Sequence, residues 1–235
     1  MSPRRDRGDW MNYLRALVMR YRRDIQTYGL WNEPNNGNWQ GSPEAYVQLI
    51  VNPAASTIKT ACPECTVVAG ALLHRETSCG FEAFGRCWNA QGEGKDWRTW
   101  MTALLNASAF TAGNIDIISY HIYAGSDFAN VALAVRSYLD RHGARGKDLW
   151  ITETGLNTRH AGIDDGDQAN YYVNALDGLR RKGLWGQTGA GLISRVFFYE
   201  FLESGGEGWG IVKAVGGQLI PKPAYYAYQR YISRN

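Results

Sequence analysis

The sequence predicts an α/β protein built on a parallel sheet of five strands. Two observations carry this prediction: short, nearly continuous apolar runs recur along the chain, and each is separated from the next by a segment with helical periodicity. Strands covered on both faces have such continuous runs, and parallel neighbours need a helical crossover between them. No sequence repeat is close enough to indicate a solenoid. The predicted strands are 25–31, 66–73, 115–123, 149–153 and 195–199.

The helices are predicted from the spacing of their apolar residues and from the residues that suit a helix start. Asp9 can cap a first helix, in which Trp10, Leu14 and Val18 follow the spacing of one helical face. Pro43 and Pro223 stand at predicted first turns, where a missing amide donor costs nothing. The predicted helices are 9–21, 43–59, 96–109, 128–141, 167–182 and a last one that begins at Pro223.

Length and charge restrict the class of protein. A chain of 235 residues with 45% hydrophobic content is predicted to form one domain, 1–235, with a packed core. The net charge of +3 is dispersed apart from Arg4 to Arg7, which argues against a nucleic-acid partner. No apolar run approaches the roughly 18 residues of a membrane span, and no signal peptide is expected before Asp9. The chain is therefore expected to be either cytosolic or already processed.

The four cysteines form two local pairs. Cys62 and Cys65 flank a Pro-Glu turn, and Cys79 and Cys87 lie in a second loop. Two short disulfides, one zinc site and free thiols are the alternatives. Disulfides are favoured because the second pair is spaced more widely than a zinc knuckle usually is. Two disulfides would indicate a secreted origin.

Polar residues end three of the predicted strands. Asn32 and Glu33 follow the first strand, His121 and Tyr123 lie at the end of the third, and Glu153 ends the fourth. Parallel α/β architectures keep their chemistry at the C-terminal ends of the strands. Two glutamates that approach each other there can divide their roles, because one remains protonated as an acid while the other is ionised and nucleophilic. Glycoside hydrolysis requires this arrangement. The alternative for each glutamate alone is a structural ion pair or helix cap.

Two motifs then carry a resemblance to a known family. The segment 31–35, Trp-Asn-Glu-Pro-Asn, resembles the acid/base motif at the end of the fourth strand of clan A glycoside hydrolases. The segment 150–155, Trp-Ile-Thr-Glu-Thr-Gly, resembles the nucleophile motif at the end of their seventh strand. Together with 118–123 and 222–226, these motifs look most like families 39 and 5 of that clan.

The resemblance implies roles for individual residues. Glu33 would be the general acid and base of a retaining hydrolysis, and Glu153 would be the nucleophile. Asn32 would bind the sugar 2-hydroxyl, whereas Tyr123 and His121 would orient Glu153 or line the subsite. Side chains that could stack under sugar rings are Trp39, Tyr199 and Trp209. This chemistry needs no metal or other cofactor.

The resemblance also implies a barrel that lacks its first part. A full (β/α)8 barrel, or TIM barrel, has eight strands, yet the strand that resembles the fourth arrives near residue 25. We therefore expect a truncated TIM barrel with about five parallel strands, equivalent to strands 4–8, and outer helices. Such a sheet has two exposed edges, so self-association into a homo-oligomer is expected.

Two function classes remain open from the sequence. The first is a retaining glycosidase that acts on β-glucan- or xylan-type polysaccharides, their oligosaccharides or aryl β-glycosides. The second is an inactive carbohydrate-binding remnant of a glycosidase barrel. A zinc-binding or nucleic-acid-binding module is a distant third. Comparing hydrolysis by the wild type with hydrolysis by glutamate variants separates the first two.

Overall fold

The computed structural model describes residues 7–74, 82–83, 86–87, 96–203 and 205–234. They contain one five-stranded sheet with the order β1-β2-β5-β6-β7, in which every neighbouring pair is parallel. The strands are β1 (Thr27–Leu30), β2 (Thr66–Leu73), β5 (Ile117–His121), β6 (Asp148–Thr154) and β7 (Ile193–Phe198). The predicted five-stranded parallel sheet is confirmed.

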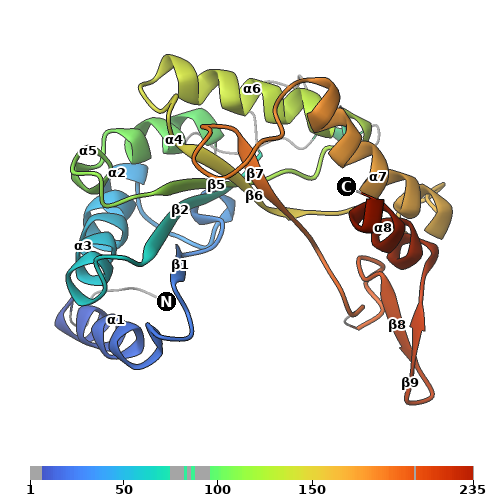
Figure 1. The fold of residues 1–235 in the computed structure, drawn as a ribbon, viewed down its shortest axis with the longest axis horizontal. Helices are drawn as coiled ribbons and strands as arrows, with labels where there is room; N and C mark the ends of the chain where they lie inside the picture. The colour runs from blue at the N-terminus through green and yellow to red at the C-terminus, as the bar shows by residue number, and fades with distance from the viewer. Residues whose placement is uncertain (1–6, 75–81, 84–85, 88–95, 204, 235) are drawn as a thin grey trace.

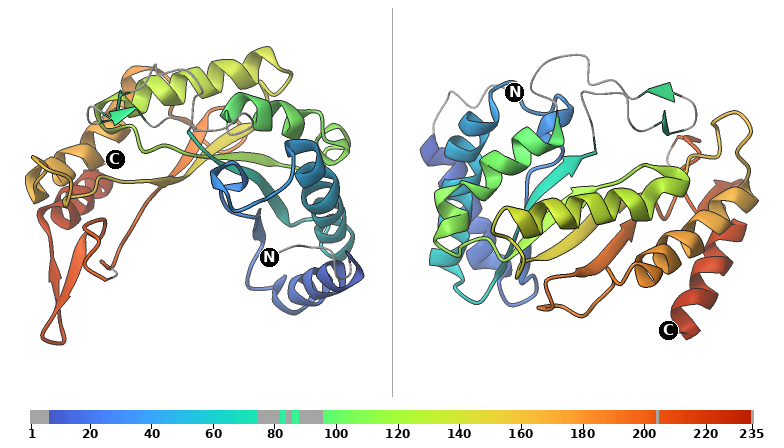
Figure 2. Two further views of the ribbon diagram at one scale, coloured as in Figure 1. Left: turned by 180° about the vertical axis from the view of Figure 1, so that it is seen from behind. Right: turned by 90° about the horizontal axis from the view of Figure 1, so that it is seen from above.

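The helices lie along one side of this sheet, and the molecule has the outline of an arch (Figure 1). Figure 2 shows from above how α4, α6 and α7 cross the sheet. The helices are α1 (Arg7–Tyr21), α2 (Pro43–Tyr46), α3 (Asn52–Ala61), α4 (Trp97–Leu105), α5 (Ser108–Thr111), α6 (Phe128–Arg141), α7 (Asp165–Arg181) and α8 (Pro223–Arg234). None of the described helices combines the length and the apolar character that a bilayer crossing requires.

The main core fills the space between the sheet and the helices. Its largest fully buried side chains include Trp97, Tyr120 and Phe128. A second, small cluster of Val68, Ile117 and Trp150 lies apart from this core. Because successive strand side chains point to opposite faces, this cluster belongs to the inner face of the arch.

Several predicted helix boundaries differ from the observed ones. Helix α1 begins at Arg7, so Asp9 lies in its first turn and is not its cap. The predicted helix 96–109 is divided into α4 and α5. Helix α7 begins two residues earlier than predicted, because the Asp164 side chain accepts hydrogen bonds from the backbone amides of Gly166 and Asp167 in a capping box.

One hairpin was missed by the sequence analysis. Strands β8 (Val212–Val215) and β9 (Gln218–Pro221) pair antiparallel beyond β7 and form one foot of the arch (Figure 1). Gly216 and Gly217 both have positive φ, 57° and 80°, as a two-residue hairpin turn requires. This Gly-Gly pair was the available sequence signal. A separate pair of two-residue strands, β3 (Glu82–Ala83) and β4 (Arg86–Cys87), is also antiparallel.

Cys62 and Cys65 form a disulfide at the C-terminal end of α3, with a Cα–Cα distance of 5.3 Å. Both side chains are fully buried. This confirms the first predicted pair. Cys79 lies outside the described residues, as does the side chain of Cys87, so their predicted pairing stays a prediction.

Candidate active site

The C-terminal ends of β1, β5 and β6 bring three ionisable side chains together. Nδ1 of His121 lies 2.9 Å from Oε1 of Glu33 and 3.4 Å from Oε2 of Glu153. One oxygen of each glutamate and a ring nitrogen of His121 all lie within 4.8 Å of one another. The two glutamates, 120 residues apart in the sequence, therefore face each other at one end of the sheet.

Glu33 is held in an unusual backbone conformation. It has a φ of 43° and precedes the 3-10 turn η1 (Pro34–Asn36). Its side chain is 11% exposed, and its second oxygen accepts a hydrogen bond from Nδ2 of Asn36 at 2.6 Å. Both carboxylate oxygens of Glu33 thus have a polar neighbour. Asn36 was not predicted as a site residue, although its position three residues after Glu33 was a signal for contact within one turn.

A bulge in β2 fixes the backbone of Glu33. The Glu33 N–H donates to the carbonyl oxygen of Ala71 at 3.0 Å, and Ala71 itself has a φ of 45°. The Ala71 N–H donates to Oγ of Ser119 on β5 at 2.8 Å. Gly70, with a φ of 118°, passes so close to β5 that a Cβ there would lie 2.4 Å from the Ser119 carbonyl oxygen. The position of Glu33 therefore depends on contacts across three strands.

A second attachment comes from Asn35, whose side chain is buried. Its Nδ2 donates to the carbonyl oxygen of Leu73 at 2.8 Å, and its Oδ1 accepts from the Leu73 N–H at 2.9 Å. This pair of bonds ties η1 to the last residue of β2. The loop that carries Glu33 is thus tied to β2 at the glutamate and again two residues after it.

Glu153 is more open than Glu33, and Tyr123 holds it. The Tyr123 hydroxyl donates to Oε2 of Glu153 at 2.9 Å. Burial raises the pKa of the Tyr123 phenol, and the charge and hydrogen bond of Glu153 raise it further. Tyr123 therefore remains a protonated donor toward the carboxylate across the neutral and moderately alkaline range.

One predicted stacking residue, Trp209, lies beside Tyr123, and a second, Tyr199, lies beside Trp209. The ring centroid of Trp209 is 5.1 Å from that of Tyr123 and 6.1 Å from that of Tyr199, both with edge-on geometry. Gly155 allows this approach, because a Cβ there would meet the Tyr199 carbonyl at 2.3 Å and the Trp209 ring at 3.2 Å. An aromatic wall of Tyr123, Tyr199 and Trp209 therefore stands next to Glu153.

The third predicted stacking residue, Trp39, lies on the loop that follows β1. Its ring packs against Trp31 and Tyr46, with centroid distances of 6.1 and 5.8 Å. Asn32 is exposed, and its backbone carbonyl accepts a hydrogen bond from Asn38 at 3.2 Å. Trp31, which the sequence analysis did not select, is 39% exposed and is the more accessible of the two indoles.

The same three ionisable groups could hold a cation. Among the described residues, Glu33, His121 and Glu153 form the one cluster whose oxygen and nitrogen atoms are spaced for metal ligation. These atoms already contact one another, and Asn36 and Tyr123 donate to the two carboxylates. Their mutual hydrogen bonds fit proton transfer between a carboxyl group and a bound substrate.

The comparisons with known proteins agree with this geometry. Residues 30–188, more than half of the chain, match the family model described as glycosyl hydrolase catalytic core. A search by sequence among curated proteins finds no match.

Several solved structures share the fold. A GH39 β-xylosidase from Caulobacter crescentus has 22% identity and a TM-score of 0.66, over 97% of this chain and 48% of that one. The GH39 enzyme from Xanthomonas axonopodis pv. citri has 21% identity and a TM-score of 0.70, over 97% and 46%. An endo-1,4-β-D-mannanase from Thermotoga petrophila RKU-1 has 16% identity and a TM-score of 0.62, over 97% and 65%.

The chain spans about half the length of the two GH39 structures. Its five parallel strands match part of a TIM barrel, as the motifs around Glu33 and Glu153 indicate. The family match includes both of these motifs. The chain therefore belongs to the glycosyl hydrolase catalytic core family.

Proposed function

We propose that the protein is a retaining glycosidase that cleaves β-glycosidic bonds. The observation that carries this proposal is the approach of Glu33 and Glu153 to within 4.8 Å, oxygen to oxygen, at the C-terminal ends of two parallel strands. Retaining enzymes have carboxyl groups about 5–5.5 Å apart, whereas inverting enzymes separate them by about 6.5–9.5 Å to admit a water molecule. The short separation supports the retaining route.

The proposed reaction has two steps. In the first, Glu33 donates its proton to the glycosidic oxygen while a carboxylate oxygen of Glu153 attacks the anomeric carbon. The bond to the leaving oxygen breaks, and a covalent glycosyl-enzyme forms. In the second, Glu33 removes a proton from water, which attacks the same carbon and releases Glu153. The catalyst returns to its starting protonation state.

The neighbours of the glutamates support these assignments. Glu33 is the more buried carboxyl group and has His121 and Asn36 within hydrogen-bond distance, which suits a group that must hold and return a proton. Glu153 is more open and has Tyr123 as a fixed donor, which suits an ionised nucleophile.

The substrate would lie between the loop after β1 and the aromatic wall. Asn32 would bind the sugar 2-hydroxyl beside Glu33, and Tyr199 and Trp209 would contact sugar rings beside Glu153. Trp39 would contribute from the loop after β1. We propose β-glucan- or xylan-type chains and aryl β-glycosides as substrates, since similar structures include a β-xylosidase and an endo-1,4-β-D-mannanase.

Hydrolysis of a panel of aryl β-glycosides and β-glycans tests the proposal. Glu33→Gln is expected to lower kcat/KM by about 10²–10⁴-fold on substrates with poor leaving groups, and Glu153→Gln to abolish turnover. Glu44→Gln, which alters an exposed glutamate on α2, is the matched control and should not change the rate. If the wild type is no faster than the double glutamate variant, the chain is not a glycosidase.

Stereochemistry tests the retaining route separately. Proton NMR of the first product should show the β-anomer before mutarotation. A 2-deoxy-2-fluoro glycoside with a good leaving group should add its sugar mass to Glu153. An initial α-anomer together with no adduct would contradict the retaining assignment while leaving the glycosidase assignment in place.

We also propose that the chain self-associates through its sheet edges. Within the described part of the chain, β1 pairs only with β2 and β7 only with β6 in the five-stranded sheet. Residues 184–186 bond the outer side of β7 at Ile193, and the rest of β7 and β1 present strand edges. Exposed apolar side chains occur on and after β7, including Phe197 and Phe201, which is 60% exposed. Light scattering over a range of concentrations should show a mass that rises above the monomer. A monomer at every concentration would contradict the proposal.

The Cys62–Cys65 disulfide supports a proposed secreted origin, because such bonds persist in oxidising compartments. Thiol titration of the denatured, unreduced protein purified from its native source should find neither of these two sulfurs free. Free thiols at Cys62 and Cys65 in that material would contradict the proposal.

A further inference from the structure

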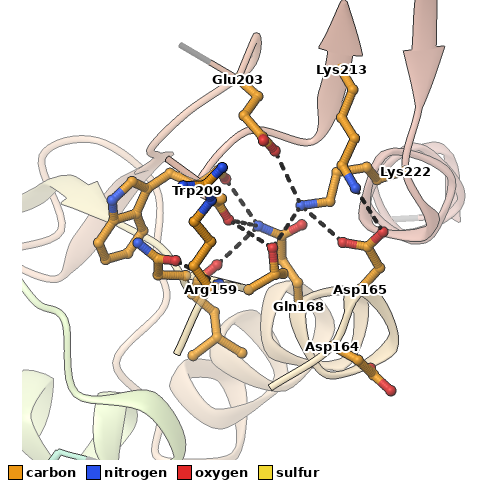
Figure 3. Close-up of polar contacts among 12 residues, drawn as sticks. Arg159, Asp164, Asp165, Gln168, Glu203, Trp209, Lys213 and Lys222 are labelled. Atoms are coloured by element: carbon orange, nitrogen blue, oxygen red, sulfur yellow. Dashed lines mark hydrogen bonds and ion pairs between the residues drawn. The ribbon is translucent and has the colours of Figure 1, made fainter. Parts of the chain in front are cut away.

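A buried polar cluster joins the two loops on the Glu153 side of the site. Figure 3 shows this cluster, in which Gln168 and Lys222 project between the loop after β6 and the loop after β7. Gln168 is fully buried on α7, and Lys222, which immediately precedes α8, is 2% exposed. Buried polar groups of this kind are costly unless they are bonded, so their partners indicate what they hold.

Gln168 holds carbonyl groups from both loops. Its Nε2 donates to the carbonyl oxygen of Leu156 at 2.9 Å and to that of Trp209 at 2.9 Å, and it lies 3.4 Å from the carbonyl oxygen of Gly208. Three acceptors surround this nitrogen, so the side-chain NH₂ group is the only end of the amide that fits there. Leu156 follows the strand of Glu153, and Trp209 belongs to the aromatic wall.

Lys222 contacts two carboxylates and one hydroxyl group of the same cluster. Nζ of Lys222 lies 3.0 Å from Oδ1 of Asp165, 3.7 Å from Oε2 of Glu203 and 3.4 Å from Oγ1 of Thr158. Thr158 in turn donates its backbone N–H to the carbonyl oxygen of Gly208 at 3.0 Å. The loops after β6 and β7 and the start of α7 are therefore connected through the buried nitrogen atoms of Gln168 and Lys222.

Among Tyr123, Tyr199 and Trp209, Trp209 is the residue to which Gln168 is bonded in the described hydrogen bonds. Gln168 bonds the Trp209 backbone, and the Trp209 ring contacts Tyr123, whose hydroxyl donates to Glu153. Gln168 itself touches none of the ionisable groups of the site in the hydrogen bonds of the described residues. Its influence on the chemistry must pass through the placement of the indole.

We propose that Gln168 is a positioning residue that holds Trp209 in the wall of the substrate site. The kinetic part of this inference rests on the proposed glycosidase function. Removing the NH₂ group takes away the bonds to the Leu156 and Trp209 carbonyl groups and leaves the loop that carries Trp209 held only by weaker or neighbouring contacts, such as the bonds from Thr158 to Gly208. A sugar ring then loses an ordered surface to pack on, while Glu33 and Glu153 keep their own contacts. Substrate binding is then affected more than the chemical step.

Steady-state kinetics of Gln168→Met test this inference. Methionine has a similar size and no donor, and we expect KM to rise about tenfold with kcat within about threefold of the wild type. Trp209→Ala should show the same pattern, and the double variant should be no worse than Trp209→Ala alone. Additive effects of the two substitutions would overturn the proposal. Gln168→Leu, which also lacks a donor and carries no charge, replaces Gln168→Met if that variant does not fold.

Arg136→Met is the matched control. Arg136 is also buried, and it donates to the carbonyl oxygens of Ala144 at 2.8 Å and Lys147 at 2.7 Å, beyond the C-terminal end of α6 and away from the aromatic wall. Its loss should lower Tm as the loss of Gln168 does, without changing KM. If both variants raise KM equally, Gln168 acts through general stability and the proposal fails.

Fluorine NMR of protein labelled with 5-fluorotryptophan tests the placement without turnover. Trp209→Phe identifies the Trp209 signal. Gln168→Met should shift or broaden that signal, and Arg136→Met should leave it in place. An unchanged Trp209 signal in Gln168→Met would overturn the inference. Because this measurement needs no substrate, it decides the role of Gln168 even if the chain does not hydrolyse glycosides.

Discussion

The backbone N–H of Glu33 donates a 3.0 Å hydrogen bond to the carbonyl oxygen of Ala71, and both residues have positive φ. Residues other than glycine rarely adopt this conformation, which costs of order 1 kcal/mol or more and persists where surrounding contacts impose it. Here the surrounding contacts come from the bulge in β2 and from Ser119. The proposed acid is thus placed by the backbone of the neighbouring strands as well as by its own loop.

Ser119→Ala should disturb Glu33 without touching it. The variant leaves the buried Ala71 N–H without its acceptor, so we expect the free energy of unfolding to fall by about 1–3 kcal/mol and kcat to fall with it. Denaturant unfolding and steady-state kinetics measure the two effects. Thr152→Val on β6 is the control, because Oγ1 of Thr152 is buried without a hydrogen-bond partner among the described residues. Equal effects of both substitutions would argue against a specific role for Ser119.

Tyr123→Phe should lower kcat by about tenfold to a hundredfold, because Glu153 loses the donor that orients it. The raised pKa of Tyr123 means that its hydroxyl stays protonated well above its usual pKa of about 10. The alkaline limb of the pH–rate profile should therefore be the same in both proteins. A limb that disappears in the variant would show that Tyr123 titrates in the assay range. Tyr28→Phe, which removes a buried hydroxyl without a partner in the described structure, is the control.

Asp165 should make the stability of the protein sensitive to acid. Burial acts to raise the pKa of its carboxyl group, but hydrogen bonds and charge from Lys222 and Lys213 outweigh this and hold the pKa below its usual value. A carboxyl group with a lowered folded-state pKa stabilises the fold above its unfolded pKa of about 3.9, and this contribution is lost as the pH falls through the folded value.

Asp165→Asn should accordingly lower stability at pH 7 and flatten the decline in unfolding free energy below about pH 4. Urea unfolding at a series of pH values measures this. Asp24→Asn, at an exposed aspartate outside the helices, should leave the curve unchanged. If the unfolding free energy of Asp165→Asn declines with falling pH as steeply as that of the wild type, other carboxyl groups cause the acid sensitivity.

Removal of the disulfide should affect stability and not catalysis. Cys62 and Cys65 close a very short loop, for which chain entropy gives a stabilisation of about 2 kcal/mol. They lie before the start of β2, at the opposite end of the strands from Glu33 and Glu153. The double alanine variant should therefore unfold at lower denaturant concentration with unchanged kcat/KM. A loss of activity in the folded variant would contradict this separation.

Much of the fold was predictable because its signals are local. Strand β2 and helix α6 have the predicted bounds, since apolar runs and helical spacing are properties of the sequence itself. The meeting of Glu33 with Glu153 was also predictable, because parallel strands place their C-terminal ends at one edge. The roles of the two residues were predicted from the resemblance to family motifs and stay a prediction.

The supports of the site were not predictable in the same way. The bulge at Gly70 and Ala71, and the reach of Gln168 across two loops, depend on contacts between segments about 40–50 residues apart. A glutamine in an amphipathic helix has the same appearance in a sequence whether it faces water or three carbonyl groups. Such residues are found only once the packing is known.

The hydrogen bonds described above for Glu33 and Glu153 come from one continuous arc of the sheet, from the loop after β1 to the end of β6. The bulge of β2 and the hydroxyl of Tyr123 brace the two carboxyl groups from within that arc. The reaction and the choice of sugar are therefore separable in this architecture. Under the proposed function, a group that faces the arc from its open side can change which glycan binds and for how long, while the proposed catalytic pair keeps its geometry.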